Sequence, residues 1–264
     1  MAARDDLTHA APLGLRFWDE AATRVVADAL GVRAHLAGRP ERPAPAARTA
    51  SGAYALHRVP GLEAVERGEA ALATPAAVVR VLVDDPRGDF LPVSFACAAP
   101  QAGFAAPAAA SLTPRALAPV SALAPSPSVP LFASPSRAVA GAALVRAELR
   151  YAGSGAPAAW ALVELRCGAT LVARALADAG GRVAALFPYP PVTVGLSSPA
   201  SWALALSACH GDAAGMDDRA DLDRVFAFDD RPLRLGASGG FATTLSAELR
   251  PGRMVDLGLV ELQA

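Results

Sequence analysis

The sequence predicts an all-β protein built from two tandem antiparallel sandwiches, over residues 1–98 and 137–264, joined by a connector over residues 99–136. Three observations support this prediction. Apolar and polar side chains alternate in short runs, with the period of a half-buried strand, in both halves of the chain. Turn-forming residues separate these runs. The segment between the halves contains mainly Ala, Pro and Ser and almost no charge.

The composition indicates a folded protein and excludes several functional classes. Of the 264 residues, 53% are hydrophobic and 19% are charged, which provides enough apolar material for a core. With 24 basic and 25 acidic side chains, the chain has no general attraction for nucleic acid or anionic lipid. No apolar run has the character of a membrane span. The residues after Met1 are not typical of a signal peptide, so we expect synthesis in the cytoplasm.

The sequence contains no Lys, Asn or Ile, and Ala is its commonest residue. A GC-rich genome explains this bias, so Ala is not evidence for helix in this chain. Strands are therefore predicted from the positions of Val, Leu, Phe, Trp and Tyr.

Short strands with turns between them are predicted in the first third of the chain. The predicted segments are 13–18, 30–36, 51–57 (a turn entering a short strand), 79–83 and 91–97. Residues 38–50 contain three prolines and are predicted to be a loop. This pattern favours a small antiparallel sandwich.

The connector, residues 99–136, is rich in proline, which lacks a hydrogen-bond donor and fixes its own backbone. An extended, semi-rigid linker is the favoured interpretation. The alternative is a segment laid along a domain surface, because Phe104, Leu112, Leu117 and Leu123 would otherwise be exposed to water.

The second half begins with the clearest alternation in the chain. Val145, Ala147, Leu149 and Tyr151 face one way, and the charged residues between them face the other. The predicted strands are 145–151, 160–166, 171–176, 183–187, 202–206, 245–249 and 255–262. The sequence Pro251-Gly252 predicts a hairpin between the last two.

The two halves resemble each other, which suggests a tandem repeat of one small β-unit. Residues 177–183, Ala-Asp-Ala-Gly-Gly-Arg-Val, and the looser copy at residues 48–54 follow a strand and precede another. This pattern resembles the carboxypeptidase regulatory-like, or transthyretin-like, sandwich. The resemblance implies a transthyretin-like or immunoglobulin-like fold for each half.

A wider set of segments covers most of the chain. They are residues 13–19, 51–62, 90–92, 131–132, 146–149, 157–161 and 187–190. Together they are similar to a family of proteins from contractile injection system clusters, the phage-tail-like particles that some bacteria assemble. These motifs are structural and carry no chemistry, so the resemblance implies a structural subunit.

The four histidines do not predict a metal site. They are His9, His35, His57 and His210. The only close pair is Cys209 and His210, and neighbours on a strand point to opposite faces. His35 and His57 fall on the polar sides of their strands and are expected to be solvated.

The three cysteines, Cys97, Cys167 and Cys209, lie far apart beside apolar strand residues. We expect them to be reduced and buried, rather than to form a disulfide or act as a nucleophile. A Cys-His nucleophile pair remains open, although nothing in the local sequence supports it.

The acidic run from Asp212 to Asp223 has the oxygen-rich character of a calcium loop. Arg219 interrupts it, and the EF-hand order of ligands and its central Gly are absent, so a solvated loop is favoured.

Glu148 and Glu164 are expected on the wet face of the sandwich. The one enzyme of the transthyretin-like fold, hydroxyisourate hydrolase, ends in Tyr-Arg-Gly-Ser, which this chain lacks. The sequence therefore predicts no catalytic residue, no cofactor and no metal ligand.

The favoured hypothesis is a non-enzymatic structural component of a contractile particle, in its baseplate, spike or fibre region. It would contact other subunits of a large assembly, with neither nucleic acid nor membrane as partner, and would leave the cytoplasm only within a released particle. Trp18 and the apolar residues of the connector are the expected contact residues. The alternatives are a two-domain adhesin or binding module for carbohydrate or protein, and a separately expressed accessory domain of an enzyme.

Overall fold

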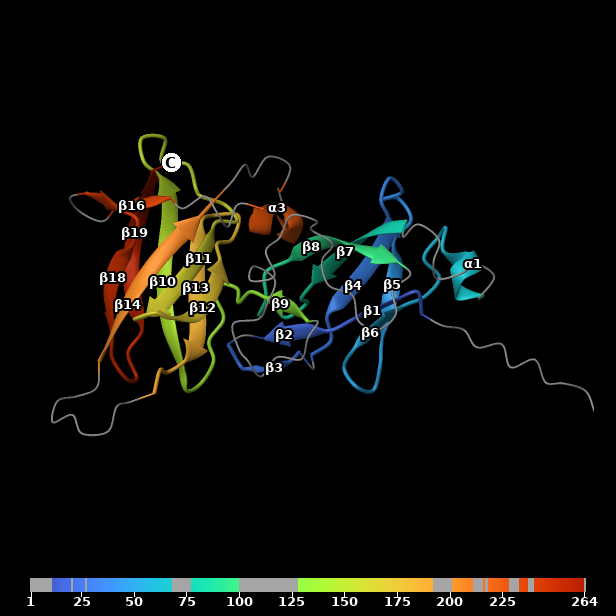
Figure 1. Ribbon diagram of the computed structural model, residues 1–264, viewed down its shortest axis with the longest axis horizontal. Coiled ribbons are helices and arrows are strands. Elements are labelled where there is room, and N and C mark those ends of the chain that lie inside the picture. The colour runs from blue at the N-terminus through green and yellow to red at the C-terminus, as the bar shows by residue number, and fades with distance from the viewer. Residues whose placement is uncertain are drawn as a thin grey trace, which may run out of the picture.

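The computed structural model describes residues 11–19, 21–26, 28–67, 77–99, 128–191, 201–210, 216, 218–227, 233–236 and 240–263. The chain is almost entirely β and forms two bodies that lie side by side (Figure 1). The predicted fold class is confirmed. No helix in the described ranges is long and apolar enough to cross a membrane.

The N-terminal body contains a seven-stranded sheet in the order β1-β6-β5-β4-β7-β8-β15 and a three-stranded sheet in the order β3-β2-β9. Its elements are β1 (Leu13–Leu15), β2 (Phe17–Asp19), β3 (Arg24–Val25), β4 (Gly31–Leu36), β5 (Ala44–Arg48), β6 (Tyr54–Leu56), α1 (Glu63–Glu66), β7 (Ala77–Asp84), β8 (Val93–Ala99), β9 (Val129–Leu131) and β15 (Ala220–Asp221). Neighbours in the large sheet are antiparallel except β8 and β15.

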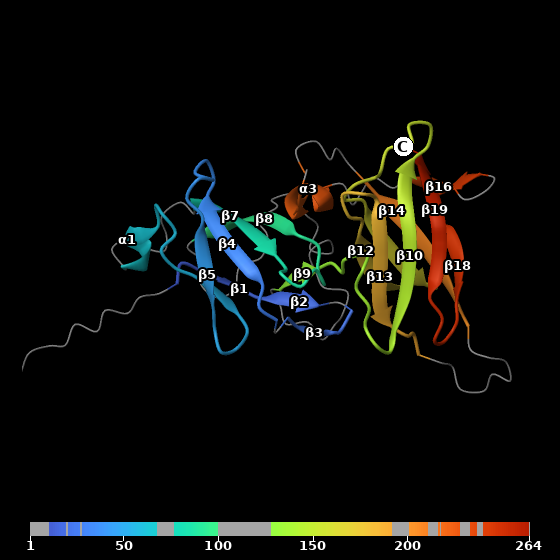
Figure 2. The same cartoon turned by 180° about the vertical axis from the view of Figure 1, so that it is seen from behind.

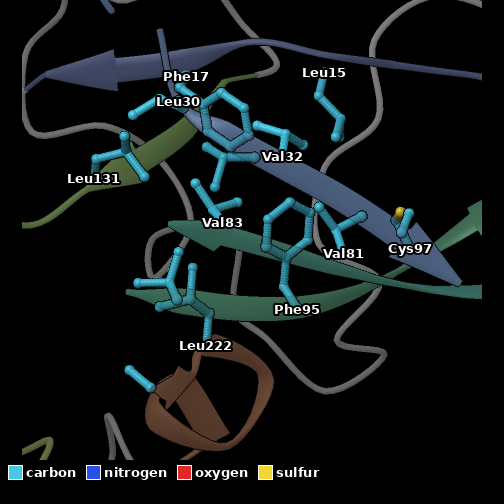
Figure 3. Packing of buried hydrophobic residues seen from close by; sticks show 14 of the residues in the cluster. Leu15, Phe17, Leu30, Val32, Val81, Val83, Phe95, Cys97, Leu131 and Leu222 are labelled. Atoms are coloured by element: carbon cyan, nitrogen blue, oxygen red, sulfur yellow. The ribbon is translucent and has the colours of Figure 1, made fainter. Parts of the chain in front are cut away.

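The core of this body follows from the alternation of its strands. Val79, Val81 and Val83 of β7 point inward and are at most 2% exposed. They pack with aromatic and aliphatic side chains from β1, β2, β4 and β8 (Figure 3). The hydroxyl of Tyr54 donates to the carbonyl of Asp28, so this buried phenol is satisfied.

Residues 38–50 are not entirely a loop, and this prediction is wrong for β5. Strand β5 pairs with β4 on one side and β6 on the other. Its ladder to β4 covers only two residue pairs, Arg33 with Pro45 and Ala34 with Ala44. A proline can lie in this strand because so short a ladder demands few backbone donors.

The end of the predicted connector is part of the N-terminal body. Residues 100–127 lie outside the described residues, including the expected contacts Phe104, Leu112, Leu117 and Leu123. After them, β9 pairs in parallel with β2, and Val129, Leu131 and Phe132 are buried in the N-terminal core. The predicted domain boundaries remain a prediction, but residues 129–132 pack as core and not as a solvated linker.

The C-terminal body is a sandwich of a five-stranded sheet, β13-β10-β19-β16-β17, and a four-stranded sheet, β12-β11-β14-β18 (Figure 2). Its strands are β10 (Ala142–Tyr151), β11 (Leu162–Cys167), β12 (Thr170–Leu176), β13 (Arg182–Pro188), β14 (Trp202–Cys209), β16 (Arg234–Gly236), β17 (Phe241–Ala242), β18 (Leu245–Leu249) and β19 (Val255–Gln263). Alternate side chains of the two sheets form a second core.

Strand β10 confirms the predicted alternation of residues 145–151. Val145, Ala147 and Leu149 are buried, while Arg146 and Glu148 face outward and are half-buried. The predicted hairpin between β18 and β19 is wrong. These two strands belong to different sheets, and β19 pairs in parallel with β10. The turn at Pro251-Gly252 therefore links one sheet of the sandwich to the other.

A crossing segment, whose described residues are 216 and 218–227, connects the two bodies. It comes from the C-terminal half of the sequence, yet β15 extends the N-terminal sheet and α3 (Leu222–Ala227) packs beside β8 (Figure 1). Leu222 is fully buried in the N-terminal core (Figure 3). The ring of Trp160, also from the C-terminal half of the sequence, is buried in the same core, and its indole nitrogen donates to the carbonyl of Met216 at 2.5 Å.

Candidate functional site

A cleft of about 800 Å³ lies between the two bodies. Its N-terminal wall comes from residues within 84–92 and 134–136. Its C-terminal wall comes from residues within 146–148, 178–183 and 256–259. This volume falls in the range of small-molecule sites, of order 300–1,000 Å³, so we treat the cleft as the candidate functional site.

The C-terminal wall is the outer face of the five-stranded sheet. Arg146 of β10 lies between Ala184 of β13 and Asp256 of β19, its cross-strand neighbours. One step along, Glu148 lies beside Leu259, which is 53% exposed. Between these two rows the register of β19 shifts. A β-bulge of this kind re-aims side chains beside it.

The N-terminal wall is built from two turns. The carboxylate of Asp85 accepts backbone N–H groups from Arg87, Asp89 and Phe90 at 2.7–3.0 Å, which closes the turn after β7. The hydroxyls of Ser134 and Ser136 bond to each other at 2.7 Å. Both sets of polar atoms are therefore already engaged in local structure.

Asp178 and Arg182 define the structural role of the motif at residues 177–183. One oxygen of Asp178 accepts the backbone N–H groups of Gly180 and Arg182, and the other accepts from the Arg182 guanidinium. Gly181 has φ +80°, and a Cβ placed there would lie 2.4 Å from the carbonyl oxygen of Leu149. The Asp and Gly of this motif therefore shape the turn before β13 and do not form a reactive site.

Arg146 differs from the other charged residues of the cleft. Its Nε is buried without a hydrogen-bond partner, and no ion pair joins its guanidinium to a carboxylate in the described part of the chain. Neighbouring Asp256 instead accepts the backbone N–H of Gly258. A buried donor without an acceptor costs about 1–3 kcal/mol. The wall of the cleft thus contains a guanidinium whose buried Nε has no hydrogen-bond acceptor.

The lining of the cleft offers guanidinium, carboxylate and hydroxyl groups. Its lining contains neither His nor Cys, and its serine hydroxyls have no base beside them. Within the described ranges, no group of three His, Cys, Asp or Glu side chains is placed to hold a metal ion. The expectation that the chain is not an enzyme remains a prediction.

The end of the acidic run, beyond Asp217, is not a solvated loop. Asp221 and Asp223 both pair with the guanidinium of Arg80 on β7, and Asp223 also accepts the backbone N–H of Ala96 at 2.7 Å. Burial raises the pKa of Asp223 above its ordinary value. These carboxylates fix the crossing segment to the N-terminal sheet. Asp212, earlier in the run, lies outside the described residues.

Two expected surface residues are buried. Trp18 is 3% exposed, because β2 is covered on both faces, so it is not a contact residue on the molecular surface. His35 is 9% exposed and its Nδ1 lies 2.9 Å from the carbonyl of Leu36, so the prediction of a solvated histidine is wrong there. His57 is half-buried at the end of β6, and His9 lies outside the described residues.

The cysteines and the paired glutamates are placed partly as predicted. None of the three cysteines forms a disulfide in the described part of the chain; Cys97 is fully buried, while Cys167 and Cys209 are half-buried. Burial raises the pKa of the Cys97 thiol to about 12. Glu148 is half exposed and pairs with Arg150, but the Glu164 side chain is only 12% exposed and pairs with two arginines. Glu164 therefore does not mark a wet face.

Comparison with known proteins adds little. No family model and no curated protein matches the chain. Among solved structures, the minor pilin GBS52 of Streptococcus agalactiae covers 96% of this chain and 97% of its own, with 8% identity and a TM-score of 0.26. A streptococcal ancillary pilin covers 94% and 68%, with 7% identity and a TM-score of 0.26. Both scores are too low to support an argument about function.

Proposed function

We propose that this chain is a non-enzymatic structural protein that works through contacts with other proteins. The observation that carries the proposal is the state of the polar groups in the cleft between the two bodies. The carboxylates of Asp85, Asp178 and Asp256 close turns, and the serines bond to each other. These groups stabilise the fold, and none of them is positioned to attack a substrate.

The connection between the two bodies also supports a structural role. Trp160 and the crossing segment both come from the C-terminal half of the sequence, and both are buried in the N-terminal core. Such buried contacts resist relative motion of the bodies, unlike the small, polar interfaces that permit domain motion. A rigid two-body protein suits a role in which it transmits force or spaces its neighbours.

Surface features provide places for partners. Strand β18 lies at the edge of its sheet and hydrogen-bonds only to β14 in the described part of the chain, with alternate residues exposed. Such an edge is a template for another strand. Val78 and Met254 are large apolar side chains that are each 49% exposed.

The finer proposal is that the assembly is a contractile, phage-tail-like injection particle, with this chain in the baseplate, spike or fibre region. It is supported by the sequence resemblance to proteins of those gene clusters. Neighbouring genes for sheath, tube and ATPase subunits would favour it. The decisive experiment deletes the gene, images the particles by electron microscopy and restores the gene as a control. Normal assembly and firing without the gene would contradict the proposal.

A second candidate function is a two-domain adhesin or binding module, and the unpaired Arg146 in the cleft favours it. The two candidates predict different behaviour of the purified protein. A particle subunit should co-sediment with particles from a deletion strain when added back. A free-standing module should bind its ligand without them.

A further inference from the structure

Arg146 occupies an unusual position for an arginine in this protein. It lies on the outward face of β10, in the wall of the cleft, with its Nε buried. Four residues further along the strand, on the same face, Arg150 donates to the carboxylate of Glu148 and to the carbonyl of Gly155. The two side chains share a strand and a face, but in the described structure only Arg150 has its hydrogen-bond acceptors.

The carboxylates that surround Arg146 form no ion pair with it in the described structure. Asp256, Asp178 and Glu148 all line the same cleft. Each is held elsewhere: Asp256 by a backbone N–H, Asp178 by its own turn and Glu148 by Arg150. The fold therefore keeps the guanidinium unpaired in a space large enough for a ligand. Such an arrangement lowers the stability of the empty protein and preorganises a binding group.

We propose that the cleft binds a carboxylate group, with the guanidinium of Arg146 as its partner. The planar fork of an arginine matches a carboxylate through two parallel hydrogen bonds. A single negative charge fits this site better than a phosphate dianion, because the nearby acidic side chains repel a second charge. The exposed side chain of Leu259, on the same wall, favours a carboxylate attached to an apolar group.

The carboxylate has two possible sources, a small organic acid or an acidic side chain of a partner polypeptide. Both present the same chemistry to Arg146, and the probes below distinguish them. The inference does not depend on the injection particle. It requires only the purified full-length chain, so its failure would leave the particle proposal standing, and the reverse also holds.

The test is calorimetric titration of the full-length protein with two probes. One is butyrate. The other is a capped hexapeptide with a single aspartate between two leucines, and its asparagine version serves as the negative control. Saturable binding of butyrate would assign the site to small carboxylates, and binding of the aspartate peptide alone would assign it to a polypeptide partner. Either result supports the proposal.

Three variants make the test specific. Arg146→Met should weaken binding at least about tenfold, while its Tm stays equal to or above that of the parent, because it removes an unpaired buried donor. Arg150→Gln is the matched control and should leave affinity unchanged. Leu259→Asp places a carboxylate on the same wall and should block the probe while Arg146 stays in place.

Several results would overturn the proposal. They are the absence of saturable binding by either probe, equal binding of the asparagine peptide, and undiminished affinity in Arg146→Met. A large loss of Tm in Arg146→Met would also count against it, because that result would mean the side chain serves the fold instead of a ligand.

Discussion

The buried ion pair between Asp19 and Arg137 is the best place to test how the end of the predicted connector is held. The two side chains are 2% and 7% exposed and meet through two hydrogen bonds, of 3.0 and 2.5 Å. Asp19 also accepts the backbone N–H groups of Ala21 and Ala22. The guanidinium lies over the ring of Phe90, 4.4 Å from its centroid. One carboxylate therefore joins β2, its following turn and residue 137.

We expect Asp19→Ala to lower the free energy of unfolding by about 3–5 kcal/mol, since it leaves a buried guanidinium without its partner. With a urea slope of about 2–3 kcal/mol per molar, the midpoint should fall by at least about 1 M. Urea unfolding followed by tryptophan fluorescence measures this change, and a second probe such as circular dichroism checks that the transition is two-state.

Two controls make the result interpretable. Arg24→Ala removes an exposed pair, in which Arg24 and Asp28 lie 3.8 Å apart with 60% and 31% of their side chains exposed, and should cost less than about 1 kcal/mol. In the double variant Asp19→Ala with Arg137→Met, removal of both charges should restore much of the loss. A loss below about 1 kcal/mol in Asp19→Ala would refute the reasoning.

Three further predictions concern single positions. Gly181→Ala should destabilise the protein by more than about 1 kcal/mol in thermal unfolding, because φ is +80° and the new Cβ would meet a backbone oxygen. Gly153→Ala is the control: its φ is +84° but the space around it is open, so it should destabilise the protein less. Burial raises the pKa of Asp223, so its contribution to the free energy of unfolding should be largest at acid pH and decline as pH rises through the folded-state pKa. The difference in free energy of unfolding between the parent and Asp223→Asn measures this contribution. A difference that does not change from pH 4 to 7 would contradict the prediction. Cys97, with its pKa raised to about 12, should resist a thiol reagent at about pH 8 until denaturant is added, whereas the two half-buried cysteines react first.

Local pattern was sufficient for most strands but not for those that depend on distant partners. Strand β10 shows a clear alternation over 145–151, and the structure confirms it. Strands β9 and β15 are only three and two residues long, and each pairs in parallel with a strand far away in sequence. No local periodicity can predict such pairs, because their partners lie outside any short window.

Two predictions of side-chain exposure were wrong for a related reason. The sequence places Trp18 and His35 on the polar faces of their strands, and that assignment assumes that one face is wet. Both side chains are buried: β2 is covered on both faces, and β4 is covered at His35 although Arg33 on the same face is exposed. Alternation distinguishes the two faces of a strand, but it does not reveal what lies against them.

The cleft could be predicted only in part. The outward direction of Arg146 follows from the alternation of β10, and the motif around Asp178 was visible in the sequence. Only the tertiary structure shows that a second body faces this sheet and that the Nε of Arg146 lacks an acceptor there.

The crossing segment has a consequence for synthesis on the ribosome. Strand β8 receives its parallel neighbour only when Ala220 and Asp221 have emerged, by which time most of the C-terminal strands have already been made. Until then the nascent N-terminal body carries an uncovered edge and lacks Leu222, Val225 and Phe226 from its core. A partly made chain of this kind is a substrate for chaperones. Expression of residues 1–136 alone should accordingly yield aggregates, and adding residues 216–227 as a tethered peptide should improve solubility.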